Sequence, residues 1–131
     1  MLDFCSKLIY NRKTMNKQEF SNELIKNKIK VSLAMLGFNE RYISFEYLAD
    51  ILTYLISKES DSIESFNNSI NLIEEKYNIS KTAVIYGLKR ITDSCLDKSI
   101  YSKAQYNLKR NCIINRIRVL KSHTLNMLFA M

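Results

Sequence analysis

The chain has 131 residues and a net charge of +7, and its 47% hydrophobic and 25% charged residues are typical of one folded domain rather than a disordered segment. With no proline and only two glycines, a sheet with many turns is disfavoured and an all-helical fold is favoured. No stretch approaches the roughly twenty apolar residues of a membrane span, so we expect an all-α, single-domain protein of the cytoplasm with no membrane contact.

The first half of the sequence predicts two amphipathic helices. The first runs from about 16 to 36, where Gly37 is placed to end it in a left-handed conformation and Phe38 to fold back on the last turn. The second has Ser44 as its expected N-cap, because a serine hydroxyl accepts a hydrogen bond from a first-turn N–H group. Polar residues 57–62 then connect it to the next helix.

The middle of the sequence predicts a helix-turn-helix. Residues 63–77 carry an apolar stripe at helical spacing and form its first helix. In the turn, Asn78 tolerates a left-handed conformation, Ile79 fills the angle between the helices, and Ser80 caps the second helix. Successive residues of a helix are rotated by 100°, so the second helix has a buried face and an exposed face. Two further residues flank the exposed face. The inward set is Val84, Leu88, Ile91 and Cys95, the outward set is Thr82, Tyr86, Lys89 and Asp93, and the flanking residues are Ala83 and Arg90.

The remaining segments complete a fold of about six helices. Residues 97–121 form one helix or two, because the helical pattern breaks around residues 106–110, and a closing helix ends the chain. Residues 1–20 are expected to be a partly helical N-terminal extension, and residues 21–131 the helix-turn-helix domain.

The sequence contains few of the residue patterns that bind metals or carry out catalysis. The three cysteines form no CxxC pair, and His123 is the only histidine, so we expect reduced, packed thiols and no metal site. There is no glycine-rich phosphate loop and no arrangement of nucleophile and base. We therefore expect no cofactor and no enzymatic activity.

Positive charge is concentrated in the C-terminal part of the chain. From residue 81 to the end there are ten Lys or Arg against two Asp, a net charge of +8, whereas residues 1–80 carry a net charge of −1. A basic surface of this kind suits the phosphate backbone of a nucleic acid. The candidate phosphate contacts are Lys89, Arg90, Lys109, Arg110, Arg116, Arg118 and Lys121.

About four-fifths of the chain resembles the C-terminal DNA-binding domain of the sporulation initiation regulator family, stage-zero sporulation protein A. The most specific matching segment is IEEKYNISKTAV at 73–84, supported by LGF at 36–38, YLADIL at 47–52, GLKR at 87–90 and the closing KSHTLNMLFAM. The resemblance implies an all-helical domain whose second helix-turn-helix helix enters the major groove of DNA, with two domains in tandem. It further implies an effector domain without the family's phosphorylatable receiver, since about twenty residues precede the matching region.

Residues carried over from the family give a mixed picture of DNA recognition. Ser80, Lys81 and Thr82 match the start of the recognition helix, where hydroxyls and N–H groups meet phosphate. The family's central Ser-Arg-Val-Glu-Arg segment reads Thr-Ala-Val-Ile-Tyr here, so the charged readers are replaced. Ala83 can touch a thymine methyl group and Tyr86 can bond a phosphate, but neither makes the bidentate contacts that discriminate bases.

Two functions follow from these observations. The first is a DNA-binding transcriptional regulator that binds duplex DNA mainly through phosphates, as a monomer, a homodimer or a tandem dimer. The alternative is a protein-interaction module or antagonist that pairs with a sporulation regulator, or with itself, through an apolar face at Ile85 and Tyr86. Steep salt dependence distinguishes the first from the second.

Overall fold

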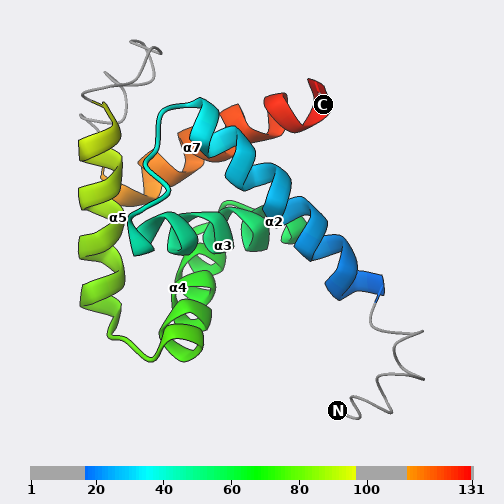
Figure 1. Cartoon of the computed structure of the whole chain (residues 1–131). Coiled ribbons are helices and arrows are strands. Elements are labelled where there is room, and N and C mark those ends of the chain that lie inside the picture. The colour runs from blue at the N-terminus through cyan, green and yellow to red at the C-terminus, as the bar shows by residue number, and fades with distance from the viewer. Residues whose placement is uncertain (1–16, 97–111, 131) are drawn as a thin grey trace.

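The computed structural model describes residues 17–96 and 112–130, and all its regular secondary structure in these ranges is helical (Figure 1). This confirms the predicted all-α single domain. Five helices are described, one fewer than the approximate number expected for the whole chain, and the predicted break at 106–110 lies outside the described residues. The helices are α2 (Lys17–Met35), α3 (Ile43–Lys58), α4 (Ile63–Tyr77), α5 (Lys81–Leu96) and α7 (Ile113–Ala130).

Helix α3 lies at the centre of the fold, and α2, α4, α5 and α7 all contact it (Figure 1). Its sequence, ISFEYLADILTYLISK, is apolar on more than one face, so a single partner could not bury it. Four of its largest side chains, Phe45, Leu48, Ile51 and Leu52, are fully buried. The core of the protein is therefore built around α3.

The left-handed ends of two helices confirm the turn chemistry predicted from the sequence. Gly37 has a φ of 101°, and the Phe38 N–H group donates to the Leu33 carbonyl at 3.0 Å, which folds the chain back on α2. Asn78 has a φ of 55° at the end of α4. Glu59 ends α3 in the same conformation, with a φ of 54°, a position that the sequence analysis treated only as polar connection.

The predicted N-cap at Ser44 is wrong. Helix α3 begins at Ile43, and Tyr42 occupies the N-cap position without a capping bond from its side chain. The Phe45 N–H group donates to the Tyr42 carbonyl at 2.9 Å, so the N-cap lies two residues earlier than expected. Ser44 therefore falls inside the helix, where it is only 5% exposed.

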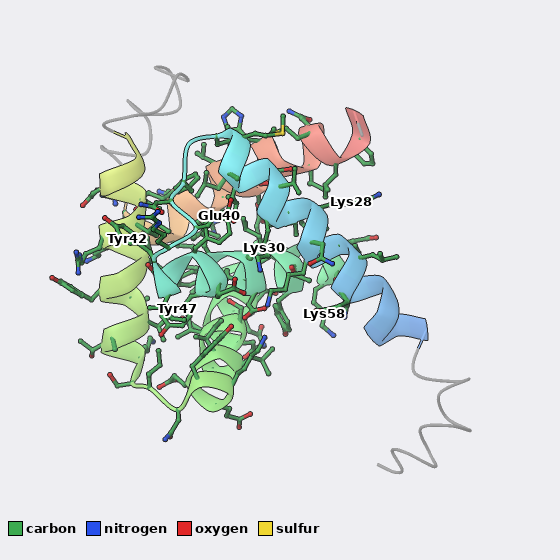
Figure 2. The ribbon with its side chains drawn as sticks, viewed as in Figure 1. Lys28, Lys30, Glu40, Tyr42, Tyr47 and Lys58 are labelled. Carbon is green, nitrogen blue, oxygen red and sulfur yellow. The ribbon has the colours of Figure 1, made fainter. Side chains whose placement is uncertain are left out.

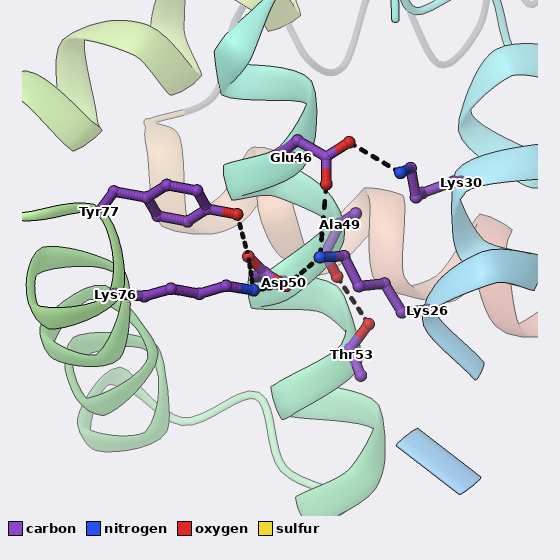
Figure 3. Close-up of polar contacts among 8 residues, drawn as sticks. All are labelled: Lys26, Lys30, Glu46, Ala49, Asp50, Thr53, Lys76 and Tyr77. Atoms are coloured by element: carbon purple, nitrogen blue, oxygen red, sulfur yellow. Dashed lines mark hydrogen bonds and ion pairs between the residues drawn. The ribbon is translucent and has the colours of Figure 1, made fainter. Parts of the chain in front are cut away.

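The carboxylate of Asp50 on α3 joins three helices (Figure 3). It accepts from Lys26 of α2 at 2.8 Å, from Lys76 of α4 at 3.1 Å, and from the Tyr77 hydroxyl of α4 at 2.7 Å. Lys26 also pairs with Glu46 at 3.3 Å. This network ties both α2 and α4 to α3.

The network keeps Asp50 ionised. Burial works to raise the pKa of Asp50, but hydrogen bonds from Lys26 and Tyr77, together with the positive charge of Lys26, outweigh it and lower the pKa below its ordinary value of 3.8. Burial and the neighbouring Asp50 carboxylate in turn raise the pKa of Tyr77, so its hydroxyl stays a donor. Asp50 therefore stabilises the fold at neutral pH and stops doing so in acid.

We expect Asp50→Asn to lower the free energy of unfolding by about 2 kcal/mol at pH 7, because it removes the charge that Lys26 and Lys76 pair with. A group whose pKa is lowered on folding loses its stabilising effect as the pH falls through the folded-state value. The variant should therefore be less sensitive than the wild type to acid below about pH 4. Urea unfolding at pH 7 and pH 3 measures both effects. The control is Glu23→Gln, exposed on α2, and equal losses in the two variants would contradict the assignment.

Candidate nucleic-acid interface

Helices α4 and α5 form the predicted helix-turn-helix. The chain turns at Asn78, whose left-handed conformation lets the Ile79 N–H group donate to the Glu74 carbonyl at 3.3 Å. Ser80 then caps α5, because its hydroxyl accepts from the Ala83 N–H group at 3.1 Å. The predicted roles of Asn78 and Ser80 are both confirmed, and Ile79 packs against the core as expected.

The inward face of α5 is also as predicted for the residues described. Val84, Leu88 and Ile91 are fully buried, and α5 contacts α3, α4 and α7. The crossing with α3 is close, because a Cβ atom at Gly87 would lie 3.1 Å from the Cβ atom of Ser44. Glycine at this position brings the first turn of α3 directly against the middle of α5.

The opposite face of α5 is exposed and basic. Tyr86, at the centre of this face, is 63% exposed, and Ile85 beside it is half-buried. The single acid in the α5 sequence, Asp93, accepts from Arg116 of α7 at 2.8 Å, so a positive charge lies beside its own. The structure brings together these sequence-predicted residues as exposed positions: Lys81, Thr82, Ala83, Tyr86, Lys89 and Arg90, with Ser80 exposed at the helix start.

Arg90 is held between two aromatic rings. Its guanidinium carbon lies 5.9 Å from the centroid of the Tyr42 ring and 5.8 Å from that of the Tyr86 ring. Both distances are within the range of cation–π attraction. Among the described residues, Arg90 has no hydrogen bond and no ion pair, so its N–H donors remain available for a ligand.

Two grooves flank Tyr86. One, of about 360 Å³, is lined only by α5 residues, including Lys81 and Lys89. The other, of about 250 Å³, lies between α5 and the start of α3, and Figure 2 labels Tyr42 and Tyr47 where these two helices meet. The lining of this second groove, called here the α3–α5 groove, is Tyr42, Ile43, Ser44, Tyr47, Ala83, Tyr86, Gly87 and Arg90.

The basic residues predicted on α7 do not join this surface equally. Arg116 is largely covered, with its side chain 12% exposed, and donates to the Thr92 hydroxyl at 2.9 Å as well as to Asp93. Arg118 donates to the Asp61 carbonyl at 2.9 Å, in the loop before α4. Lys121 is half-buried on α7, and the predicted contacts Lys109 and Arg110 lie outside the described residues.

The sequence analysis missed the contribution of α3 to this surface. Ile43 is 60% exposed, Tyr42 touches Arg90, and Arg41 is exposed one residue earlier. Contact between two residues separated by nearly fifty positions depends on how α3 and α5 cross, and helical periodicity does not encode that. The only local signal was Gly87, an unexplained glycine inside a helix.

A larger cavity of about 460 Å³ lies between α2, α3 and α4, away from the exposed face of α5. Several of its polar groups are already used. Asp50 and Lys76 bond to each other, and the hydroxyls of Thr53 and Ser69 donate to carbonyls of their own helices at 2.7 and 2.6 Å. This polar lining serves the packing of the three helices, and it shares no residue with the basic surface.

Comparisons with known proteins give no match to this chain, either from a family model, from a curated protein or from a solved structure. Within residues 17–96 and 112–130, no helix is long and apolar enough to cross a membrane. In the same ranges, no group of three or more His, Cys, Asp or Glu side chains is placed to hold a metal ion. Function is therefore argued from the site itself.

We expect Arg116→Gln to lower the free energy of unfolding by about 1–2 kcal/mol, because the bond to the buried Thr92 hydroxyl is lost while the bond to the more exposed Asp93 contributes less. Lys121→Gln, on the same helix, should change it by less than about 0.5 kcal/mol. Urea unfolding followed by circular dichroism compares the two. Unchanged stability in Arg116→Gln would return this residue to the set of candidate DNA contacts.

Proposed function

We propose that this protein is a DNA-binding transcriptional regulator that binds duplex DNA through the exposed face of α5. The observation that carries the proposal is the charge of that face: Lys81, Lys89 and Arg90 are exposed, whereas Asp93 is paired with Arg116. A basic helix that follows a short turn, with its inward side buried, can enter a major groove while its cations meet phosphates.

The proposed recognition is mainly electrostatic. Lys81 and Thr82 at the start of α5, with Lys89 and Arg90 further along, bind backbone phosphates and set the position of the helix. Ala83 offers a thymine methyl group an apolar contact, which gives a limited preference for sequence. The role is that of a cytoplasmic effector domain similar to the sporulation regulator's, acting by binding rather than catalysis and without a cofactor, alone or as a homodimer or tandem dimer on DNA.

A protein partner is the second candidate, and the exposed apolar side chains favour it. Ile43 is 60% exposed and Tyr86 is 63% exposed, on the two walls of the α3–α5 groove. In this case the domain pairs with a sporulation regulator or with a second copy of itself, and that binding resists salt because apolar burial does not depend on counterion release.

We expect the protein to bind two labelled duplexes, one with the sporulation regulator's box and one scrambled, with a steep and similar loss of affinity as salt is raised. Lys89→Gln should reduce the slope of log K against log salt by about 0.9, the value for one lost phosphate contact. Lys28→Gln, an exposed lysine of α2, is the matched control and should leave the slope unchanged. Fluorescence anisotropy over a salt series measures all three proteins.

Absence of duplex binding at low salt would overturn the proposal in favour of a protein partner. Clear preference for the regulator's box would mean that α5 reads bases, and the mainly electrostatic recognition proposed here would then be wrong. An equal loss of slope in Lys28→Gln and Lys89→Gln would show that charge acts over the whole surface rather than at α5.

A further inference from the structure

The start of α3 has no side-chain cap. Tyr42 occupies the N-cap position in an extended conformation, and its side chain makes no capping bond. Phe45 N–H bonds to the Tyr42 carbonyl, but the Ile43 and Ser44 N–H groups have no acceptor among the described residues. A helix of 16 residues therefore presents unpaired donors and the positive end of its dipole at one edge of the α3–α5 groove.

Ser44 adds a second and independent observation. It is 5% exposed and lines the α3–α5 groove, yet its hydroxyl has no hydrogen-bond partner among the described residues. The other buried serines differ from it, because the hydroxyls of Ser32 and Ser69 donate to carbonyls of their own helices at 3.1 and 2.6 Å. Buried hydroxyls are usually paired, so an unpaired one that faces a groove indicates a missing partner.

The α5 wall of the groove holds a positive charge, Arg90, and a glycine, Gly87. Arg90 is held against Tyr42 and Tyr86 with its donors unpaired, and it lines the same groove. Gly87 packs closely against Ser44, since an added Cβ atom would lie 3.1 Å from the Ser44 Cβ atom and 3.8 Å from its hydroxyl oxygen, so a larger side chain would crowd this part of the groove. N–H groups, a hydroxyl that can donate and a guanidinium therefore line the same groove.

We infer that the α3–α5 groove is a phosphate-binding site, and that its ligand is a phosphodiester group of the DNA backbone. The inference rests on the proposed function and assigns one phosphate to a defined place. A helix N-terminus, a hydroxyl and an arginine are the groups that bind phosphate oxygens in proteins. The nearest acid in the sequence of α3, Glu46, bonds to Lys30 of α2 at 2.7 Å and to Lys26, so its charge is already compensated.

This site gives α5 a fixed position on DNA. Base edges are not bound bidentately by Ala83 or Tyr86, so the register of α5 depends on phosphate contacts. A phosphate held between α3 and α5 ties the strand to two helices at once, whereas Lys81 and Lys89 are single flexible cations. The groove therefore works as a clamp beside the recognition helix.

The first test uses inorganic phosphate and no DNA. In ¹⁵N-labelled protein, added phosphate should shift the backbone amide signals of Ile43 and Ser44 and the Arg90 Nε–H signal, relative to sodium chloride of equal ionic strength. Ser44→Ala should weaken this response about tenfold or more, as expected for one hydrogen bond to a charged group. Signals of the exposed Lys28 serve as the reference for nonspecific effects of salt.

The second test uses duplex DNA and a matched pair of serine variants. Ser44→Ala should bind duplex more weakly than the wild type by about tenfold or more, while its melting temperature stays the same or rises, because the free protein loses no hydrogen bond. Ser32→Ala, equally buried on α2, removes a hydroxyl that is already paired and should leave DNA affinity unchanged. Arg90→Gln should weaken binding about tenfold or more.

The outcomes separate this inference from the proposed function. If the wild type binds duplex, but phosphate shifts no groove signal and Ser44→Ala binds normally, the phosphate site is wrong and DNA binding stands. If phosphate shifts the groove signals but no duplex binds, the proposed function and the DNA source are wrong. Weaker DNA binding by Ser44→Ala, with unchanged melting and a weakened phosphate response, supports both.

Discussion

The rest of the structure depends on the packing of four helices around α3, and the Asp50 carboxylate strengthens that packing by bonding to two of them. Every other described helix packs against α3, and the Asp50 carboxylate binds α2 through Lys26 and α4 through Lys76 and Tyr77. Tyr77 is the last residue of α4, directly before the turn that leads into α5. A charged bond on one side of α3 therefore helps to set the direction in which α5 leaves, because the turn itself is short and has a fixed conformation.

The buried and the exposed faces of α5 are constrained differently. Val84, Leu88 and Ile91 are fully buried, and Gly87 permits the close crossing with α3, so this side is constrained by packing. The outward positions touch little of the core, and their residue types are free to change without disturbing the helix. This independence lets exposed positions carry Ala83 and Tyr86 without any change to the buried face of α5. It also explains why the fold alone does not reveal which ligand the exposed face of α5 binds.

Local chemistry was predictable from the sequence, and contacts between distant segments were not. Gly37 and Asn78 adopt the left-handed conformations expected of them, and Ser80 caps α5, because each depends on a few neighbouring residues. Arg116 looked like a free cation in a basic block, but it bonds to Thr92 and Asp93 across a helix contact that charge counting cannot see. The candidate face of α5 was predictable from periodicity, whereas the wall supplied by α3 required the crossing of two helices.

The misplaced N-cap shows how such a contact can override a local preference. A serine at the start of a helix normally stabilises the helix by capping it, and Ser44 could have done so two residues after Tyr42. Instead the first turn closes at Tyr42. Ser44 then packs against Gly87, and Phe45 is buried in the core. The apolar burial gained by α3 outweighs one cap, and the cost is a helix end whose donors lack partners within the described chain. Tyr42, at the cap position, lies within cation–π range of Arg90, so the arrangement that leaves the donors open also brings a cation near them.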